Sequence, residues 1–102
     1  MRVRWTAGAR SDLQRIKQYI AQDSLAAAER VADAIVLRTR LLSSFPSSGR
    51  TLRRYAGRTF RELVEPPYRI VYEVHQDAVS IVAVFHARRD IPPLLLKLEK
   101  LQ

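Results

Sequence analysis

The chain has 102 residues, with 18 Lys and Arg against 10 Asp and Glu, a formal net charge of +8, and 47% hydrophobic side chains. This size and composition predict one folded domain over residues 1–102 and exclude a disordered chain. No apolar run approaches the roughly 20 residues of a membrane span, and no secretion signal follows the basic N-terminus, so we expect a cytoplasmic protein. Without cysteine, and with only His75 and His86 as histidines, we expect no disulfide, no metal and no cofactor.

Arginine carries most of the positive charge, since 15 of the 18 basic residues are arginine. The guanidinium is always ionised, and its planar fork of donors matches carboxylates and phosphates. A basic domain of this size therefore favours an acidic partner, which can be a nucleic acid, the ribosome or a negatively charged protein. The alternative interpretation is a basic surface that only keeps the protein soluble.

Two amphipathic helices are predicted after a short strand over Arg2–Trp5. The first runs from its capping residue Thr6 to Gln22, with polar side chains, Asp12 among them, on the side opposite an apolar stripe of Ala9, Leu13, Ile16 and Ile20. The second runs from Ser24 until Pro46 stops it, with a stripe of Ala28, Val31, Ala32, Ile35, Leu42 and Phe45, widened by Leu37 and Leu41. Because the link between the helices is short, we expect an antiparallel hairpin.

The second half of the chain is predicted to form a sheet. A loop rich in Ser, Gly and Arg is expected from Pro46 to Thr59, and the hydrophobic period then changes from 3.6 to 2. This change predicts three strands, over Phe60–Val64, Tyr68–Val74 and Ala78–His86. The last two are apolar on both faces, which favours the centre of the sheet. The fold class is therefore α+β, in the order β-α-α-β-β-β, with an antiparallel sheet packed against the N-terminal helix hairpin.

A leucine-rich C-terminal tail follows the last strand. Ile91, Leu94, Leu98 and Leu101 can line one face of a tail helix within residues 91–102, which leaves Leu95 and Leu96 as surplus apolar residues. Packing on the core is the default interpretation of this tail. Contact with a partner is the alternative.

Arginines cluster in the sheet and its loops, at Arg50, Arg53, Arg54, Arg58, Arg61, Arg69, Arg88 and Arg89. Arg61 and Arg69 lie on strands, and Arg88-Arg89 follows the last strand. These strand ends can converge with His86 on one side of the sheet, which suits a phosphate or a carboxylate. Alternatively, Arg61 and Arg69 pair with glutamates as a solvated ladder, formed with Glu62, Glu65 and Glu73.

RNA cleavage is one chemistry that this cluster could serve. It needs a proton acceptor, a proton donor and cations for the phosphorane charge. Arg69 and Arg89 can supply the cations, and His86 titrates in the right range. A second acid–base group is not obvious, although Glu62 is a candidate, so the site is only half-equipped for catalysis.

The order of these elements resembles the RelE/ParE toxin superfamily, and the ParE-like branch of type II toxin–antitoxin systems most closely. The resemblance covers almost the whole chain. It rests on Trp5-Thr6, Ala9, Asp12-Leu13, Ile16, Tyr19-Ile20-Ala21, Phe45-Pro46, Gly49-Arg50, Arg61-Glu62-Leu63-Val64, Pro67-Tyr68-Arg69-Ile70-Val71-Tyr72 and His86-Ala87-Arg88-Arg89-Asp90. Each motif alone is weak, whereas their order and spacing together are specific.

The resemblance implies a toxin, with a cognate ParD-like antitoxin whose acidic, amphipathic C-terminal segment wraps its surface. It implies DNA gyrase as the target if the chain follows the ParE branch, and ribosome-dependent cleavage of messenger RNA if it follows the RelE branch. We expect Arg50, Arg58 and Arg61 to bind the antitoxin. We expect the target to contact Arg69, His86, Arg88 and Arg89.

Departures from the nuclease pattern favour the gyrase branch. The chain has Arg61-Glu62-Leu63 where RelE-type nucleases carry a lysine-rich strand, Leu95 near their C-terminal tyrosine, and Ala87 where an aromatic residue follows the histidine of other relatives. We therefore expect a protein-binding inhibitor rather than an enzyme, with no assigned catalytic residue. If the chain is an endoribonuclease, its catalytic residues are His86, Arg69 and Arg89.

Overall fold

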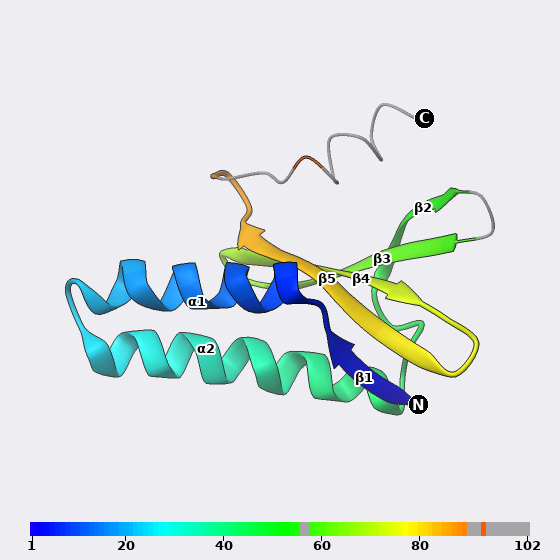
Figure 1. The fold of residues 1–102 in the computed structure, drawn as a ribbon, viewed down its shortest axis with the longest axis horizontal. Coiled ribbons are helices and arrows are strands. Elements are labelled where there is room, and N and C mark those ends of the chain that lie inside the picture. The colour runs from blue at the N-terminus through cyan, green and yellow to red at the C-terminus, as the bar shows by residue number, and fades with distance from the viewer. Residues whose placement is uncertain (56–57, 90–92, 94–102) are drawn as a thin grey trace.

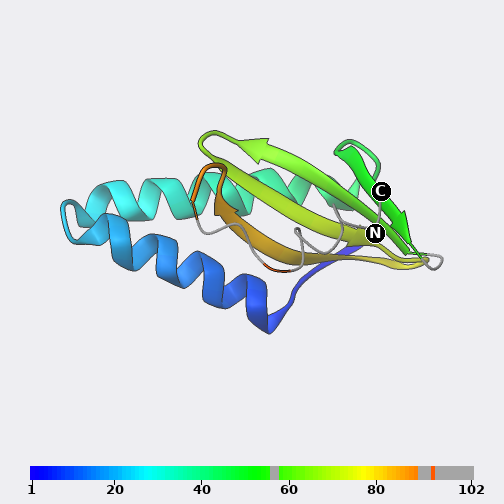
Figure 2. The same cartoon turned by 90° about the horizontal axis from the view of Figure 1, so that it is seen from above.

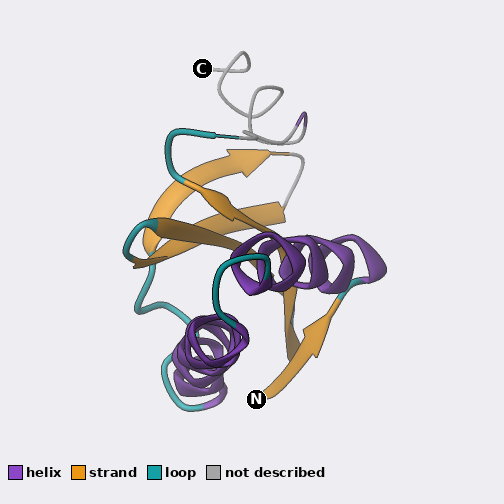
Figure 3. Cartoon of the chain, turned by 90° about the vertical axis from the view of Figure 1, so that its left-hand side faces the viewer, coloured by secondary structure: helices purple, strands orange, loops and turns teal. Residues whose placement is uncertain are grey.

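The computed structural model describes residues 1–55, 58–89 and 93, with the backbone alone at 53 and 55. The described elements follow the order β1 (Arg2–Trp5), α1 (Ala7–Ala21), α2 (Leu25–Arg40), the 3₁₀ turn η1 (Leu41–Ser43), β2 (Arg50–Tyr55), β3 (Arg58–Glu65), β4 (Tyr68–Val74) and β5 (Ala78–His86). They form one sheet, ordered β1-β5-β4-β3-β2, with both helices on the same side of it (Figures 1 and 3). The α+β class with an N-terminal helix hairpin is confirmed, while the tail predicted over 91–102 lies outside the described residues except for Pro93.

The two helices begin at the predicted capping residues and run side by side in opposite directions (Figure 2). The Thr6 hydroxyl accepts a hydrogen bond from the Ala9 N–H at 3.1 Å, and the Ser24 hydroxyl accepts one from the Ala27 N–H at the same distance. Each cap satisfies a backbone donor that the first helical turn leaves without a partner. None of the helices within the described residues is both long and apolar enough to cross a membrane.

The predicted second helix is wrong at its C-terminal end. The α-helix stops at Arg40 and tightens into η1 before Pro46. Leu37, Leu41 and Phe45, which were predicted to face the core, are 62%, 49% and 63% exposed. The buried residues of α2 are Ala28, Ala32, Ile35 and Thr39, which lie on one side of the helix. The predicted apolar stripe therefore included residues that lie outside the core.

The sheet differs from the prediction in two respects. It is mixed rather than antiparallel, because β1 pairs with β5 in parallel, from Arg2 opposite Ala78 to Trp5 opposite Ile81. It also contains a fourth strand after the hairpin, since β2 occupies Arg50–Tyr55 within the predicted loop. β2 is an edge strand that pairs with β3 through a bulge after Thr51, and its arginines masked its strand character in the sequence.

The other strands lie where they were predicted, with β3 longer by two residues at its start and one at its end. β4 and β5 are inner strands of the sheet and have apolar side chains on both faces. Tyr68, Ile70 and Tyr72 pack toward the helices, whereas Val71 packs on the other face with Phe60, Ala83 and Phe85.

Tyr72 also anchors the segment that leads into β2. Its hydroxyl donates to the Pro46 carbonyl oxygen at 2.9 Å and accepts from the Gly49 N–H at 2.8 Å. A Cβ atom at Gly49 would lie 2.5 Å from the Tyr72 hydroxyl oxygen and 2.6 Å from the Glu62 carbonyl oxygen. Glycine is therefore required at position 49 for close packing. Burial of the Tyr72 phenol in the same place raises its pKa.

Candidate functional site

The outer face of the sheet, which is the face turned away from the hairpin, carries three of the predicted site arginines. Side chains alternate along a strand, so Glu62 and Arg69 lie on the outer face, whereas Arg61, opposite Tyr72, faces the hairpin side. Arg50 is the partner of Glu62 across the β2–β3 pair, which places it on the outer face as well. Arg58 precedes Phe60 by two residues on β3 and shares this face.

Glu62 holds two of these arginines at once. Its Oε1 atom accepts from Arg50 Nη2 at 2.8 Å, and its Oε2 atom accepts from Arg69 Nε at 2.7 Å. The Arg69 guanidinium also lies over the Phe85 ring, 5.2 Å from its centroid. The Glu62 side chain is only 6% exposed, and a buried carboxylate stays charged only when cations and donors replace its water.

Glu73 forms a second ion pair on the outer face. Its oxygens accept two hydrogen bonds from Arg58, from Nε at 2.6 Å and from Nη2 at 2.8 Å, in a bidentate arrangement. These bonds lower the pKa of Glu73 and raise that of Arg58. Arg58 also covers the Phe60 ring at 4.9 Å, and His75 Nε2 lies 3.6 Å from Glu73 Oε1.

The ladder interpretation is thus confirmed for Arg69 with Glu62, although the carboxylate is buried rather than solvated. Arg61 forms neither of the two predicted arrangements, the cluster with His86 or the ladder with a glutamate. Its Nη1 atom donates to the carbonyl oxygens of Gly49 at 2.9 Å and Ser47 at 3.3 Å. Within the described residues Arg61 has no ion pair with a glutamate, and it supports the loop that precedes β2.

His86 and Arg89 lie at a different place, beside an open hollow of about 660 Å³ between α1 and the end of β5. We call it the α1–β5 hollow, and the residues that matter for its chemistry are Asp12, Arg15, Tyr19, Tyr68, His86 and Arg89. The rings of His86 and Tyr68, its partner across the β4–β5 pair, form a T-shaped contact with centroids 5.9 Å apart. The Arg89 guanidinium carbon lies over the Tyr19 ring, 5.1 Å from its centroid.

Arg69 and His86 do not converge. Arg69 pairs with Phe85 across the β4–β5 pair and points to the outer face. His86 is one residue further along β5 and points to the helix side, where it lines the α1–β5 hollow. The structure therefore brings together His86 and Arg89, separates both from Arg69, and leaves Arg88 exposed in the turn after β5.

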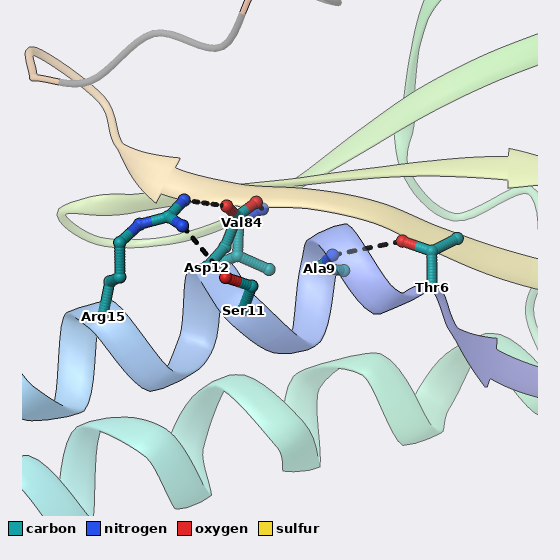
Figure 4. Close-up of polar contacts among 6 residues, drawn as sticks. All are labelled: Thr6, Ala9, Ser11, Asp12, Arg15 and Val84. Carbon is teal, nitrogen blue, oxygen red and sulfur yellow. Dashed lines mark hydrogen bonds and ion pairs between the residues drawn. The ribbon is translucent and has the colours of Figure 1, made fainter.

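Asp12 forms one wall of the hollow. Its Oδ2 atom accepts a hydrogen bond from the Val84 N–H at 3.0 Å, and its Oδ1 atom is paired with Arg15 (Figure 4). β1 ends at Trp5, opposite Ile81, while β5 continues to His86. The carboxylate therefore serves an N–H group of β5 beyond the point where β1 stops pairing with it.

The prediction placed Asp12 on the polar side of α1, which is wrong, and it assigned no role to Tyr19. Both could have been found from helical spacing. Asp12 and Tyr19 follow Ala9, the buried residue of α1, by three and ten positions, and these offsets return to nearly the same side of a helix. Among the described residues no three His, Asp or Glu side chains are grouped as a metal site would require.

The fold and the surface together define a class, which is a small basic α+β domain with a helix hairpin on one face of a mixed sheet. The same arrangement occurs in a chain of a chromosomal ParDE toxin–antitoxin system from P. aeruginosa, at a TM-score of 0.67, 21% identity and coverage of 84% of this chain and 95% of that one. The toxin–antitoxin complex RelBE2 of Mycobacterium tuberculosis contains another similar chain, at a TM-score of 0.61, 29% identity and coverage of 83% and 95%. This is the RelE/ParE-like toxin fold.

Sequence comparison narrows the class to a family. A family model described as the ParE toxin of the type II toxin–antitoxin system parDE matches residues 3–91. The protein named Toxin RelE2 from Caulobacter vibrioides is 42% identical over 86 residues, which are 83% of this chain and 93% of the relative. The chain belongs to the ParE toxin family of type II toxin–antitoxin systems.

Proposed function

We propose that this toxin inhibits DNA gyrase by binding, without a turnover of its own, and that a cognate ParD-like antitoxin neutralises it. The proposal that the toxin acts by binding, without turnover, rests on the separation of Arg69 from His86 on opposite faces of the sheet. A ribonuclease of the expected type would need both side chains, with Arg89, around one phosphate. Arg69 is instead held by the buried Glu62 carboxylate and by the Phe85 ring.

The acid–base groups near His86 favour the same conclusion. Asp12 is the carboxylate that lines the hollow among the described residues, and its oxygens are engaged by the Val84 N–H and by Arg15. A carboxylate held in this way is poorly placed to exchange protons with a substrate. A binding surface, by contrast, needs no matched pair of proton donor and acceptor.

The gyrase half is tested with purified toxin and gyrase from the same species. Toxin should block supercoiling or accumulate cleaved DNA, while messages on translating ribosomes stay whole. No effect on gyrase at several-fold molar excess would overturn the proposal. Codon-linked cleavage of messages, reduced roughly 100-fold by His86→Ala, would establish the ribosome-dependent endoribonuclease instead.

The antitoxin half is supported by charge and by exposed apolar surface. The chain carries a net charge of +8, and the Arg50 and Arg58 side chains remain 71% and 55% exposed beside their glutamates. Leu37 on α2, Leu41 on η1 and Phe45 just after η1 follow one another at intervals of four residues, and all three are exposed. The arginines lie on the outer face of the sheet and the apolar residues on the hairpin side. An acidic amphipathic segment that wraps the toxin matches both, since its apolar residues can cover the exposed apolar side chains while its carboxylates meet the arginines.

Titration of toxin with its antitoxin at low and high salt tests this half. Leu41→Glu should weaken the complex by about 100-fold, because it places a charge in the apolar contact. Leu25→Glu is the matched control, since Leu25 is 65% exposed at the opposite end of α2. Equal affinities for the two variants would remove the α2 stripe from the interface, and loss of the complex at high salt would show that it is purely ionic.

A further inference from the structure

The α1–β5 hollow has a chemistry that neither gyrase binding nor antitoxin binding requires. We propose that it binds one nucleotide of a single-stranded nucleic acid, with the base stacked against Tyr19 and the phosphate held by Arg89 and His86. This goes beyond the proposed function because it assigns the toxin a nucleic-acid contact of its own. Its volume of about 660 Å³ falls within the range of roughly 300–1,000 Å³ that is usual for ligand pockets.

Among the described residues, Arg89 is a cation without a carboxylate beside it. Arg50, Arg58 and Arg69 are each paired with a glutamate, and Arg15 is paired with Asp12. Within the described residues Arg89 contacts the Tyr19 ring and has no carboxylate partner. A guanidinium whose central carbon lies over an aromatic ring still has N–H groups that can donate to phosphate oxygens.

His86 presents a second donor to the hollow. Its Nδ1 atom accepts a hydrogen bond from the Arg88 backbone N–H at 3.2 Å. The neutral imidazole must then carry its proton on Nε2, which makes that nitrogen a hydrogen-bond donor. His86 at the end of β5 and Arg89 in the turn that follows it therefore both offer donors to an anion.

Tyr19 indicates which group the ligand carries in addition to its phosphate. Its side chain is 59% exposed on α1, at the rim of the hollow, beside the guanidinium of Arg89. A peptide carboxylate would use the cation and leave this flat aromatic surface empty. A nucleotide uses both, since every base can stack on an aromatic ring while its phosphate meets the arginine.

Direct binding of short labelled oligonucleotides tests the proposal on the full-length toxin. Fluorescence anisotropy should detect binding of single-stranded DNA or RNA at low salt. Tyr19→Leu should weaken it by about 10-fold, whereas Tyr19→Phe, which keeps the ring, should leave it unchanged. Arg89→Gln should weaken it by a similar factor and lower the slope of log affinity against log salt by about one.

Arg10→Gln is the charge-matched control, because Arg10 is exposed on α1 and does not line the hollow. It should change the affinity by less than about 3-fold and serves to correct for the general loss of positive charge. Equal effects of Arg10→Gln and Arg89→Gln, or of Tyr19→Leu and Tyr19→Phe, would overturn the proposal. Absence of oligonucleotide binding by the wild-type chain would overturn it as well.

Two parallel assays keep this proposal separate from the proposed function. If supercoiling is inhibited but oligonucleotides do not bind, only the nucleotide site is refuted. If oligonucleotides bind through Tyr19 and Arg89 but gyrase is unaffected, only the gyrase proposal fails. If Tyr19→Leu weakens the antitoxin complex and not oligonucleotide binding, the hollow is a protein-binding site and the nucleotide proposal is wrong.

Discussion

The outer face of the sheet and the α1–β5 hollow both contain arginine, but they hold it in different ways. On the outer face, Glu62 and Glu73 are buried and fasten Arg50, Arg69 and Arg58 by short hydrogen bonds. At the hollow, Arg89 rests on an exposed tyrosine ring. A buried carboxylate must keep its cations, because their loss leaves an uncompensated charge away from water. An arginine without such a partner can exchange its contacts for those of a ligand, so net charge alone does not reveal which arginines are available.

The largest effect should come from disturbing the approach of β2 to β3, on which the outer-face pairs depend. Gly49→Ala should lower the free energy of unfolding by about 3 kcal/mol, because the new Cβ would meet the Glu62 carbonyl oxygen at 2.6 Å. Gly8→Ala is the control, since Gly8 lies in α1 with its nearest neighbouring atom at 3.9 Å. It should be neutral or stabilise the protein by up to about 1 kcal/mol. Denaturant unfolding of both variants measures this difference, and equal stabilities would contradict the packing described for Gly49.

A matched pair of arginine substitutions compares the two regions directly. Arg69→Gln should destabilise the protein by about 2 kcal/mol, because Glu62 keeps only the more exposed Arg50. Arg89→Gln should change the unfolding free energy by less than about 0.5 kcal/mol, as expected for an exposed side chain outside a buried network. Thermal and denaturant unfolding of the two variants provide the measurement. Equal destabilisation would show that the two regions do not differ as described.

A smaller loss of stability is expected from substituting Asp12, which lies on the wall of the hollow. Asp12→Ala should cost about 1.5 kcal/mol, since the Val84 N–H then loses its acceptor. Asp12→Asn should cost less, because an amide oxygen can still accept that hydrogen bond. Hydrogen exchange at Val84 should accelerate in Asp12→Ala and remain slower in Asp12→Asn. Equal exchange rates in the wild type and in Asp12→Ala would exclude the bond as a support of β5.

The smallest effect on stability is expected from removing the ion pair between Glu73 and the exposed Arg58. Arg58 holds the pKa of Glu73 below its ordinary value of 4.5 in the folded protein. The resulting stability is present above the unfolded-state pKa and is lost as pH falls through the lower folded-state pKa. Wild type should therefore exceed Glu73→Gln in stability at pH 7, and this advantage should shrink as the pH falls below about 4.5. Urea unfolding across this range measures the difference, and an advantage independent of pH would exclude the ion pair as its source.

Several features could be predicted from the sequence because neighbouring residues encode them. Thr6 and Ser24 cap their helices through contacts only three residues away, and Tyr68–Val74 and Ala78–His86 carry their strand pattern within themselves. The family could likewise be assigned from short motifs in their order along the chain. β2 was missed because an arginine-rich edge strand has little hydrophobic alternation to read.

The features that could be predicted from the amino-acid sequence were therefore local: the helix hairpin, the central strands and an excess of arginine. Which arginines are held by carboxylates and which are available depends on contacts between distant segments of the chain. A bulge in the pairing of β4 with β5 and the alternation of side chains set the faces of Arg69 and His86. The parallel pairing of β1 with β5 joins residues more than 70 positions apart, as does the bond from Asp12 to Val84. Such contacts depend on how the hairpin packs across the sheet, and no pattern within a single segment records that packing.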